Sequence, residues 1–306
     1  MFDQAEIIEF LEMTDIEYER DYPLDIATTF RVGGKAKIAV FPSSGEQFAD
    51  FADFAENCDI EYTVFGRGSN LLVPDEGIDC AVMMKKLDFV SFDTEGDTVT
   101  CGCGASLTSL ASQAGKMGYS GLEFAYGIPG SVGGAALMNA GAYGGQVSDV
   151  ILAVTYYSPQ FGFGAFDIDD CRYSYRHSAF MDSDKIILTV TFGLKRGNSD
   201  EIKATMQDYM QRRIDKQPLD KPSAGSVFKR PAPDAYVGKM IEESGLKGYR
   251  IGGAAVSEKH AGFIVNEGGA SCKDIRALIK YVKDVIREKY GYELECEIRM
   301  PGGEEP

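Results

Sequence analysis

Two glycine-rich segments are the parts of this sequence whose residue types and spacing could bind a ligand. The first, Phe65–Leu71 (FGRGSNL), directly follows a predicted strand. Its two glycines let the backbone curl so that successive N–H groups point inward, and Ser69 and Asn70 add hydrogen-bond donors. Such a nest suits a pyrophosphate. Because Gly-Ser-Asn is also an ordinary turn sequence, the residues alone leave both interpretations open.

The second segment, Gly127–Gly145 (GIPGSVGGAALMNAGAYGG), lies within an uncharged run over residues 124–148 that contains seven glycines. So many glycines cost conformational entropy on folding, which is tolerated where the backbone passes close to a flat, rigid ligand. A large planar cofactor is therefore one interpretation, and a structural turn before a helix starting near Ser131 is the other. The glycines, Pro129 and Asn139 favour a buried ligand wall over a membrane span.

The charge balance restricts the partners. The 306 residues include 31 Lys and Arg against 47 Asp and Glu, so the formal net charge is −16. This field repels polyanions, which argues against nucleic acid as a partner. Residues 212–230 are locally different, with six basic residues and two acidic ones. Positive charge gathered there could attract a small anionic ligand.

Missing motifs narrow the chemistry further. The sequence has no GxGxxG, GxxxxGK[ST] or GxSxG motif, which argues against a Rossmann turn, a P-loop and an α/β-hydrolase. Seven cysteines without a CxxC motif and only two histidines predict no metal site, and Cys101 and Cys103 are expected to be small buried thiols. The N-terminus lacks the pattern of a signal peptide, so we expect a cytoplasmic protein without membrane insertion.

The elements that must position these residues follow from hydrophobic periodicity and turn signals. Helices are predicted over 3–20, 46–58, 106–118, 199–218, 236–244 and 272–290. Strands are predicted over 35–44, 60–69, 81–84, 89–92, 98–104, 150–158, 185–195, 252–257, 261–266 and 293–300. This pattern predicts an α+β protein with a domain boundary near residue 200.

Six motifs, in this order and spread from about Thr28 to Arg299, resemble the UDP-N-acetylenolpyruvoylglucosamine reductase family. They are TTFRVGG (28–34), GRGSNLL (66–72), the second glycine-rich segment, YRHS (175–178), AGSVFK (224–229) and LECEIR (294–299). The resemblance implies an FAD-binding fold of the vanillyl-alcohol oxidase type over 1–200, in two lobes of about 1–75 and 76–200. A C-terminal α+β substrate-binding domain over 201–306 would follow.

The resemblance also implies an oxidoreductase with non-covalent FAD and with NADPH as the hydride donor. Flavin N5 would pass hydride to C3 of a UDP-linked enolpyruvyl sugar, and a proton at C2 would complete UDP-N-acetylmuramate for peptidoglycan synthesis. The cofactor-binding residues would be Gly66, Arg67, Gly68, Ser69, Asn70, Leu71, Gly127, Ile128, Pro129, Gly130, Ser131, Gly133, Gly134, Asn139, Gly141 and Ala142.

Three residues match the catalytic positions of the family. Arg176 would grip the substrate carboxylate with its planar fork, Ser226 would donate the proton to C2, and Glu297 would be the carboxyl partner. Without the resemblance, the residues fit a salt-bridged arginine, a turn serine and an exposed acidic face that includes Glu293 and Glu295.

Two lysines match substrate-binding positions of the family. Lys216 would contact the substrate pyrophosphate, although a basic helix end that complements the dipole explains it equally well. Lys229 would also bind substrate.

The distance of 50 residues between Arg176 and Ser226 resembles the shorter form of the family, which lacks a tyrosine-bearing insertion. Tyr143, Tyr173 and Tyr175 are candidates to cover the substrate, and each could equally be a packing residue. His260 is expected to be structural.

Two alternative functions remain open from the sequence. One is another oxidase of the same flavin fold, acting on sugar lactones or alcohols. The other is a catalytically silent binding protein that scaffolds or senses a cell-wall precursor.

Overall fold

The computed structural model describes residues 4–301. Residues 1–3 and 302–306, which include the start of the predicted first helix and the outer ends of the two predicted domains, lie outside the described residues. The chain forms two compact units. Unit 1 contains the chain up to Glu19, Ile38–Arg67 and Cys80–Arg212, and unit 2 contains Arg20–Lys37, Gly68–Asp79 and the chain from Arg213 onward. The expected domain boundary near residue 200 stays a prediction.

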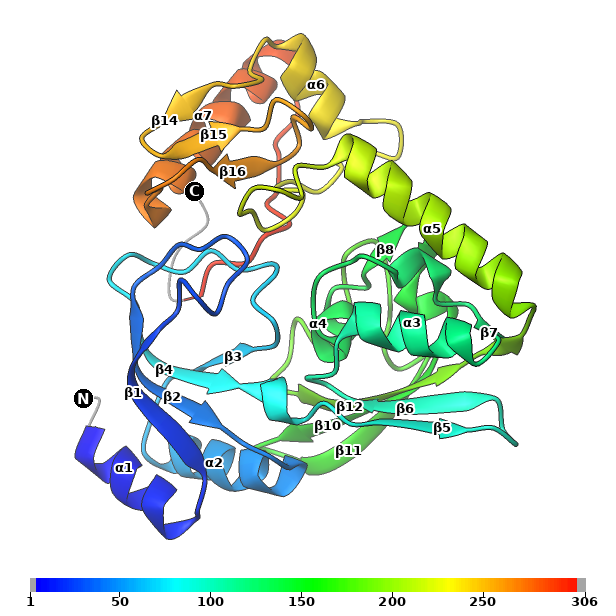
Figure 1. The fold of residues 1–306 in the computed structure, drawn as a ribbon. Helices are drawn as coiled ribbons and strands as arrows, with labels where there is room; N and C mark the ends of the chain where they lie inside the picture. Colours follow the sequence, from blue (N-terminus) through cyan, green and yellow to red (C-terminus); the bar gives the residue numbers. More distant parts are fainter. Residues whose placement is uncertain (1–3, 302–306) are drawn as a thin grey trace. The chain divides into compact units, whose positions relative to one another are not determined.

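Helices and strands are interspersed along the chain, in agreement with the predicted α+β class (Figure 1). The α-helices are α1 (Gln4–Met13), α2 (Gly45–Asn57), α3 (Leu107–Lys116), α4 (Val132–Leu137), α5 (Ser199–Lys216), α6 (Val237–Glu243) and α7 (Cys272–Tyr290). The strands are β1 (Glu17–Pro23), β2 (Lys35–Phe41), β3 (Thr63–Phe65), β4 (Ile78–Met83), β5 (Val90–Asp93), β6 (Thr98–Gly102), β7 (Tyr119–Ser120), β8 (Gly141–Ala142), β9 (Gly145–Gln146), β10 (Ile151–Ser158), β11 (Gly162–Asp167), β12 (Ile186–Gly193), β13 (Lys195–Arg196), β14 (Arg250–Ile251), β15 (Ala254–Val256) and β16 (Ile264–Asn266).

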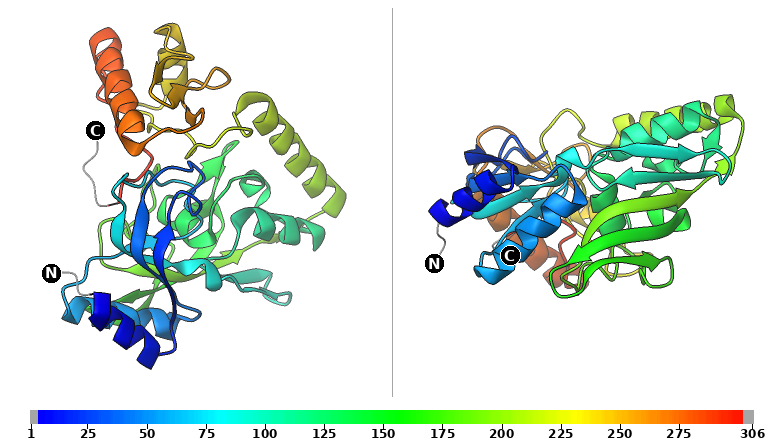
Figure 2. Two further views of the ribbon diagram at one scale, coloured as in Figure 1. Left: turned by 60° about the vertical axis from the view of Figure 1, so that its left-hand side comes forward. Right: turned by 90° about the horizontal axis from the view of Figure 1, so that it is seen from below.

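A five-stranded antiparallel sheet forms the centre of unit 1, in the order β11-β10-β12-β6-β5. Helix α4 packs over β12 and β6 of this sheet. Helix α5 lies along α3, as Figures 1 and 2 show, and a Cβ on Gly115 of α3 would come within 2.9 Å of Met206 of α5. This stacking of α5 on α3 gives α5 a fixed place in the unit.

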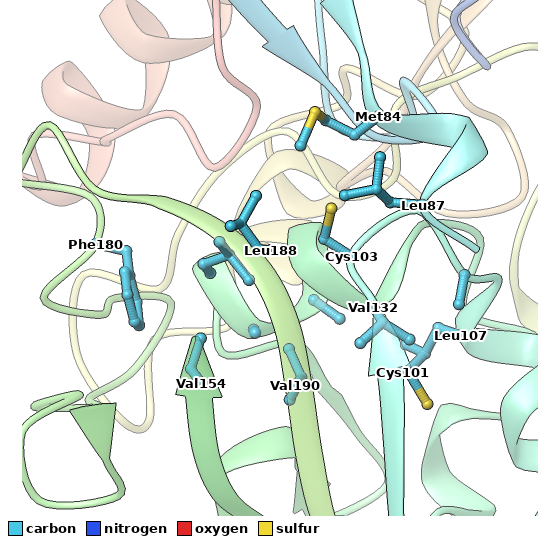
Figure 3. Packing of buried hydrophobic residues seen from close by; sticks show 14 of the residues in the cluster. Met84, Leu87, Cys101, Cys103, Leu107, Val132, Val154, Phe180, Leu188 and Val190 are labelled. Carbon is cyan, nitrogen blue, oxygen red and sulfur yellow. The ribbon is translucent and has the colours of Figure 1, made fainter. Parts of the chain in front are cut away.

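Part of the core of unit 1 lies between the sheet and α4 (Figure 3). Cys101 and Cys103 are buried there beside Val132 and Val190, as the sequence predicts for small thiols. Burial raises the pKa of both thiols to about 12, because a thiolate would lose its hydration in this apolar setting. Both cysteines therefore act as packing residues.

The second sheet has the order β1-β2-β4-β3, with β3 parallel to β4. Its connection through α2 confirms the β-α-β order expected from the sequence. Ser44 caps α2 by accepting from the N–H of Gln47 at 3.1 Å, and Phe48 and Phe51 on one face of α2 are fully buried.

Helix α7 is the main helix of unit 2, and its bounds are those predicted. Ser271 and Asp274 form a capping box, and Gly291 ends the helix in the left-handed conformation with φ of 74°. The buried face of α7 packs against β14 and β15 of the three-stranded sheet β14-β15-β16 (Figure 1).

Two predicted elements have a different structure, and the predicted strand over 60–69 is reduced to β3 (Thr63–Phe65). The first helix ends at Met13 instead of residue 20, because Asp15 takes the left-handed conformation with φ of 52° and the following residues pair with β2 as strand β1. The predicted strand 293–300 forms only isolated bridges, since Cys296 pairs with Phe228 while Arg299 pairs with Leu71. Within residues 4–301, no helix has the length and hydropathy to cross a bilayer.

Candidate active site

The two glycine-rich segments meet within unit 1, at Gly66 and Ser131. A Cβ on Gly66 would lie 2.1 Å from Ser131 Oγ, so only glycine fits after strand β3. Ser131 is buried and caps α4, where its Oγ accepts from the N–H of Gly134 at 3.2 Å. Gly66 and Ser131, which are 65 positions apart in the sequence, are therefore in contact.

The first turn of α4 uses its N–H groups within the protein. Val132 N–H donates to Ala105 O at 2.8 Å, Gly133 N–H to Cys103 O at 2.9 Å, and Gly134 N–H to the capping serine. A Cβ on Gly133 would lie 2.7 Å from Cys103 Cβ. Gly133 thus allows the helix to approach the strand, a structural role that the sequence left open.

The residues before α4 form an irregular loop. Gly127 and Gly130 have φ of 84° and 143°, which explains why glycine occurs at both positions. Ile128 O accepts from Thr108 Oγ1 at 2.8 Å and Gly130 O accepts from Leu107 N at 3.2 Å, with Pro129 between them. These bonds fix the loop against the start of α3.

A tight hairpin follows α4. Strands β8 and β9 pair through Gly141 with Gln146 and Ala142 with Gly145, so Tyr143 and Gly144 form a two-residue turn. Both turn residues have positive φ, 54° and 89°, which a two-residue hairpin of the I′ type requires. The tyrosine in this turn is held in a conformation that costs a bulky residue about 1–2 kcal/mol.

Asn139 lies just before this hairpin and is almost fully buried. Its Nδ2 donates to Gln146 Oε1 at 3.3 Å and to Ser174 O at 2.9 Å, and its Oδ1 accepts from Ser148 N at 3.2 Å. The side-chain amide therefore joins the hairpin to the segment that carries Arg176.

Arg176 lies in a two-residue turn closed by Ser174 and His177, whose backbones exchange hydrogen bonds of 3.1 and 3.3 Å. Its guanidinium donates through Nη1 to Asn139 O at 3.3 Å and through Nη2 to Gly141 O at 3.2 Å. These contacts use two of the five guanidinium donors and fix the plane of the fork beside the glycine-rich segment. The predicted arginine and the second glycine-rich segment thus belong to one cluster in unit 1.

Ser226 lies in unit 2, in an extended segment. It forms an antiparallel bridge with Phe263, and the next residue, Val227, donates to Gly262 O at 2.9 Å. Gly225 has φ of 79°, and apart from its two neighbours in the chain no residue lies within 4 Å of a Cβ placed there. Ser226 therefore follows a glycine with left-handed backbone angles, and the pairing of residues 226–227 with residues 262–263 holds it in place.

Glu297 lies beside the same segment, because its N–H donates to Val227 O at 2.7 Å. Asn70, from the first glycine-rich segment, donates through Nδ2 to Glu297 O at 3.0 Å and accepts from Arg299 N at 2.9 Å. Glu297 is half-buried, whereas Glu295, two positions away, has a side chain 75% exposed. The acidic-face interpretation therefore does not extend to Glu297.

The first glycine-rich segment is divided between the two units. Gly66 and Arg67 lie in unit 1, whereas Gly68–Leu71 lie in unit 2. Gly68 has φ of 61°, and a Cβ on it would lie 2.0 Å from Ala27 O. Within unit 2, Leu71 pairs with Arg299.

The two predicted substrate lysines also lie in unit 2. Lys216 is exposed and is the last residue of α5, whereas Lys229 forms an ion pair with Glu295 at 3.3 Å between Nζ and Oε2. The backbone N–H of Lys229 also donates to the backbone carbonyl of Glu295 at 3.0 Å.

The motif TTFRVGG acts as a frame for these segments. Thr29 Oγ1 donates to Ser223 O at 2.7 Å, Asn266 Nδ2 donates to Phe30 O at 3.3 Å, and a Cβ on Gly33 would lie 2.5 Å from Val73 Cβ. Residues far apart in sequence are thereby linked, and no local pattern predicts such pairing.

His260 makes contacts within the protein that fit the structural role expected for it. Its Nδ1 accepts from the N–H of Gly262 at 3.1 Å, and its ring packs edge-on against Phe263 at 5.0 Å. Burial lowers its pKa, and Nδ1 cannot carry a proton while it accepts from an N–H. The neutral ring orients the turn that pairs with Ser226.

These features fit FAD. The segments meet at a position where only glycine is possible, and the loop from Gly127 to Gly130 needs glycine for its backbone angles. Main chain without side chains can approach a planar ring and a pyrophosphate closely. In residues 4–301 no cluster of side chains suited to a metal occurs.

Comparison with known families gives two matches. Residues 36–160 match the FAD binding domain family, and residues 217–301 match the C-terminal domain of UDP-N-acetylenolpyruvoylglucosamine reductase. The first match spans the contact between Gly66 and Ser131, and the second spans Ser226 and Glu297. The predicted fold class is thereby confirmed, and the protein is an FAD-dependent oxidoreductase.

Full-length relatives agree with these matches. The chain is 44% identical over 296 residues to UDP-N-acetylenolpyruvoylglucosamine reductase of Caldicellulosiruptor bescii, covering 96% of this chain and 93% of the relative. It is 45% identical over 284 residues to the enzyme of the same name from Clostridium botulinum strain Okra, covering 93% of this chain and 92% of the relative.

A solved structure supports the same relationship. The crystal structure of UDP-N-acetylenolpyruvylglucosamine reductase from Thermus caldophilus superposes with a TM-score of 0.78 and 33% identity, covering 93% of this chain and 98% of that one. The family resemblance found in the six sequence motifs is confirmed. The chain belongs to the UDP-N-acetylenolpyruvoylglucosamine reductase family.

Proposed function

We propose that this protein reduces UDP-N-acetylglucosamine enolpyruvate to UDP-N-acetylmuramate in peptidoglycan precursor synthesis, with NADPH as the reductant. The observation that carries the proposal is the anchored guanidinium of Arg176 beside the second glycine-rich segment. When bound, FAD supplies the hydride-transfer chemistry. The protein's own residues must bind the substrate, stabilise developing charge and deliver a proton.

The two glycine-rich segments hold FAD in this proposal. Because the N–H groups of Gly133 and Gly134 already donate within the protein, these residues serve the site through packing. The pyrophosphate then depends on main-chain N–H groups elsewhere in the segments, together with the side chains of Ser69 and Asn70. Asn70 is already anchored to Glu297 O, so its place is fixed before a ligand binds.

Arg176 binds the substrate carboxylate. Reduction at C3 develops negative charge at C2 that delocalises into the adjacent carboxylate, and a preorganised cation stabilises that charge. The two carbonyls that accept from Arg176 hold its plane in advance, so little reorganisation is needed when the substrate arrives.

Ser226 delivers the proton to C2. A hydroxyl is a weak acid in water, but a nearby cation and the exclusion of water favour release of its proton to a carbanion. Glu297 assists as a carboxyl group that is protonated or shares a proton, since two bare carboxylates cannot occupy one site cheaply. A backbone hydrogen bond of 2.7 Å joins Glu297 to Val227, the residue after Ser226. This pairing supports a shared role of Ser226 and Glu297 in proton delivery.

Lys216 and Lys229 bind the diphosphate of the substrate. In a chain with a net charge of −16, residues 212–230 gather six basic residues against two acidic ones. The ion pair of Lys229 with Glu295 is partly exposed, so a diphosphate can compete for the ammonium group at modest cost.

Anaerobic stopped-flow tests the assignment of Ser226. The enzyme is reduced with NADPH and then mixed with the enolpyruvyl substrate, and the return of the yellow colour is followed in wild type and in Ser226→Ala. We expect reduction by NADPH to be unchanged and reoxidation by substrate to slow by about 100-fold or more. Ser244→Ala is the matched control, because Ser244 follows the last residue of α6 and its hydroxyl donates to Met240 O. Reoxidation of Ser226→Ala at the wild-type rate would show that another group donates the proton.

A further inference from the structure

An aromatic stack joins the hairpin of the glycine-rich segment to helix α5. The rings of Tyr143 and Tyr209 are nearly parallel, with centroids 4.5 Å apart and planes inclined by 12°. Tyr143 is the first residue of the β8–β9 turn, and Tyr209 is a half-buried residue of α5. Both residues belong to unit 1.

The turn at Tyr143 needs such support. Tyr143 has φ of 54°, in the left-handed region that bulky side chains rarely adopt. A strained residue keeps its conformation only where its surroundings determine it. The flat face of Tyr209 supplies a contact that depends on the orientation of the Tyr143 ring, and therefore on the backbone of the turn.

The hairpin that carries Tyr143 also holds Arg176. The arginine donates to Gly141 O, in strand β8, and to Asn139 O, two residues before that strand. The Asn139 side chain in turn bonds both Gln146 of β9 and the carbonyl of Ser174 at the base of the arginine turn. A shift of the hairpin therefore moves both carbonyls that orient the guanidinium.

Helix α5 is a rigid support for this arrangement. Ile202 and Met206, on the turns before Tyr209, are buried and lie against Gly115 of α3. The stack thus connects the hairpin to an element that is anchored in the core of unit 1.

We propose that Tyr209 is a positioning residue for Arg176, acting through the Tyr143 ring and the β8–β9 hairpin. This inference rests on the proposed function, in which Arg176 grips the substrate carboxylate. In this role Tyr209 acts through its stack with Tyr143 and not by contact with the reacting atoms. Its ring fixes the hairpin, the hairpin fixes two carbonyls, and these carbonyls fix the plane of the guanidinium.

The test removes the ring and measures its coupling to the arginine. In Tyr209→Ala we expect kcat/KM for the enolpyruvyl substrate to fall by about 10- to 100-fold, because small misplacements of a binding group have effects of this size. Reduction by NADPH and the FAD content should stay at wild-type levels. Tyr209→Phe keeps the flat ring and should restore activity to within about twofold of wild type.

Tyr281→Ala is the matched control. Tyr281 forms a stack with Tyr249 of nearly the same geometry, with centroids 4.5 Å apart and planes inclined by 14°, but this pair lies in unit 2. Its loss should leave kcat/KM unchanged. If Tyr209→Ala does not fold, Tyr209→Leu, which keeps apolar volume without a flat face, is measured in its place.

The Arg176→Lys background separates the inference from the proposed function. If Tyr209 acts through the arginine, Tyr209→Ala should lower activity by less than about twofold in this background. An equal fold loss in both backgrounds, or a fully active Tyr209→Ala enzyme, would overturn the positioning role. A fully active Arg176→Lys enzyme would instead overturn the proposed role of the arginine.

A spectroscopic readout is independent of turnover. In protein labelled with ¹⁵N-arginine, the Nε–Hε signal of Arg176 is assigned by its loss in Arg176→Lys. We expect this signal to shift or broaden in Tyr209→Ala and to stay in place in Tyr281→Ala. An unchanged signal in Tyr209→Ala would also contradict the proposal.

Discussion

The contact between Gly66 and Ser131 predicts a specific penalty for Gly66→Ala. The added Cβ would lie 2.1 Å from Ser131 Oγ, whereas ordinary contacts begin near 3.4 Å, so the two groups must separate by more than an ångström. If the serine hydroxyl turns away, α4 loses its cap to Gly134, which costs about 1 kcal/mol. If the backbone moves instead, overpacking costs about 1–3 kcal/mol. Either route should lower the free energy of unfolding by about 1–3 kcal/mol.

A double-mutant cycle with Ser131→Ala isolates this contact. The serine variant alone should lose about 1 kcal/mol through its cap. In the double variant the overlapping Oγ is gone and the nearest atom is Ser131 Cβ at 3.1 Å, so most of the Gly66→Ala penalty should disappear. We therefore expect the two losses to be less than additive by about 1 kcal/mol or more.

Urea unfolding followed by far-UV circular dichroism measures the cycle, and flavin absorbance measures the FAD retained by each variant. Gly45→Ala is the control, because it begins α2 and its nearest neighbour is the flexible end of Leu188 at 3.1 Å. This control should change stability by less than about 1 kcal/mol. Additive losses within about 0.5 kcal/mol, or a Gly66→Ala protein as stable as wild type, would refute the described contact.

Two further predictions concern unit 2. Asp75 accepts from the N–H groups of Cys272 and Lys273 at 2.7 and 3.0 Å, at the start of α7. Because these bonds cap the helix, Asp75→Ala should lower the free energy of unfolding by about 1–2 kcal/mol. Urea unfolding at neutral pH measures this change, and an unchanged unfolding midpoint would contradict it. Burial lowers the pKa of His260 below its ordinary value of about 6.5, so the unfolded chain binds its proton first and stability should fall as pH drops through and below about 6.5. His260→Asn can still accept from Gly262 N–H and should reduce this pH dependence, as unfolding midpoints measured from pH 7.5 to 5 would show; an identical pH profile in the variant would argue against the assigned neutral ring.

Local signals predicted some elements accurately. The bounds of helix α7 could be predicted from sequence because Ser271 and Asp274 form its capping box and Gly291 ends it. The glycine-rich segments could be found because glycine at Gly127 and Gly130 answers a local requirement for positive φ. Such features depend on neighbours in the sequence alone.

Features that depend on distant partners could not be predicted in this way. The amphipathic pattern predicts a helix through residue 20, but the segment Glu17–Pro23 pairs with β2 and is a strand. Strand β11 (GFGAFD) is also missing from the predicted elements. Its two glycines disfavour a strand locally, and it forms one only by pairing with β10. Tertiary pairing here overrides propensity.

The candidate site shows the same division. The resemblance to the family supplied Ser226 and Glu297, but no sequence pattern indicated that Asn70 hydrogen-bonds the Glu297 carbonyl across 227 positions. Likewise, Tyr209 reads as an ordinary helix residue until its ring is seen against Tyr143. Positioning residues of this kind have no signature along the chain.

The composition of unit 2 from three separate stretches has a consequence for biosynthesis. Arg20–Lys37 and Gly68–Asp79 leave the ribosome long before Glu297 and Arg299, the residues to which Asn70 bonds. At about 5–20 residues per second, these early stretches wait about 10 seconds or more for their partners. During translation these stretches are therefore exposed without their pairing partners. In a nascent chain truncated shortly before its end they would remain accessible to chaperones and proteases.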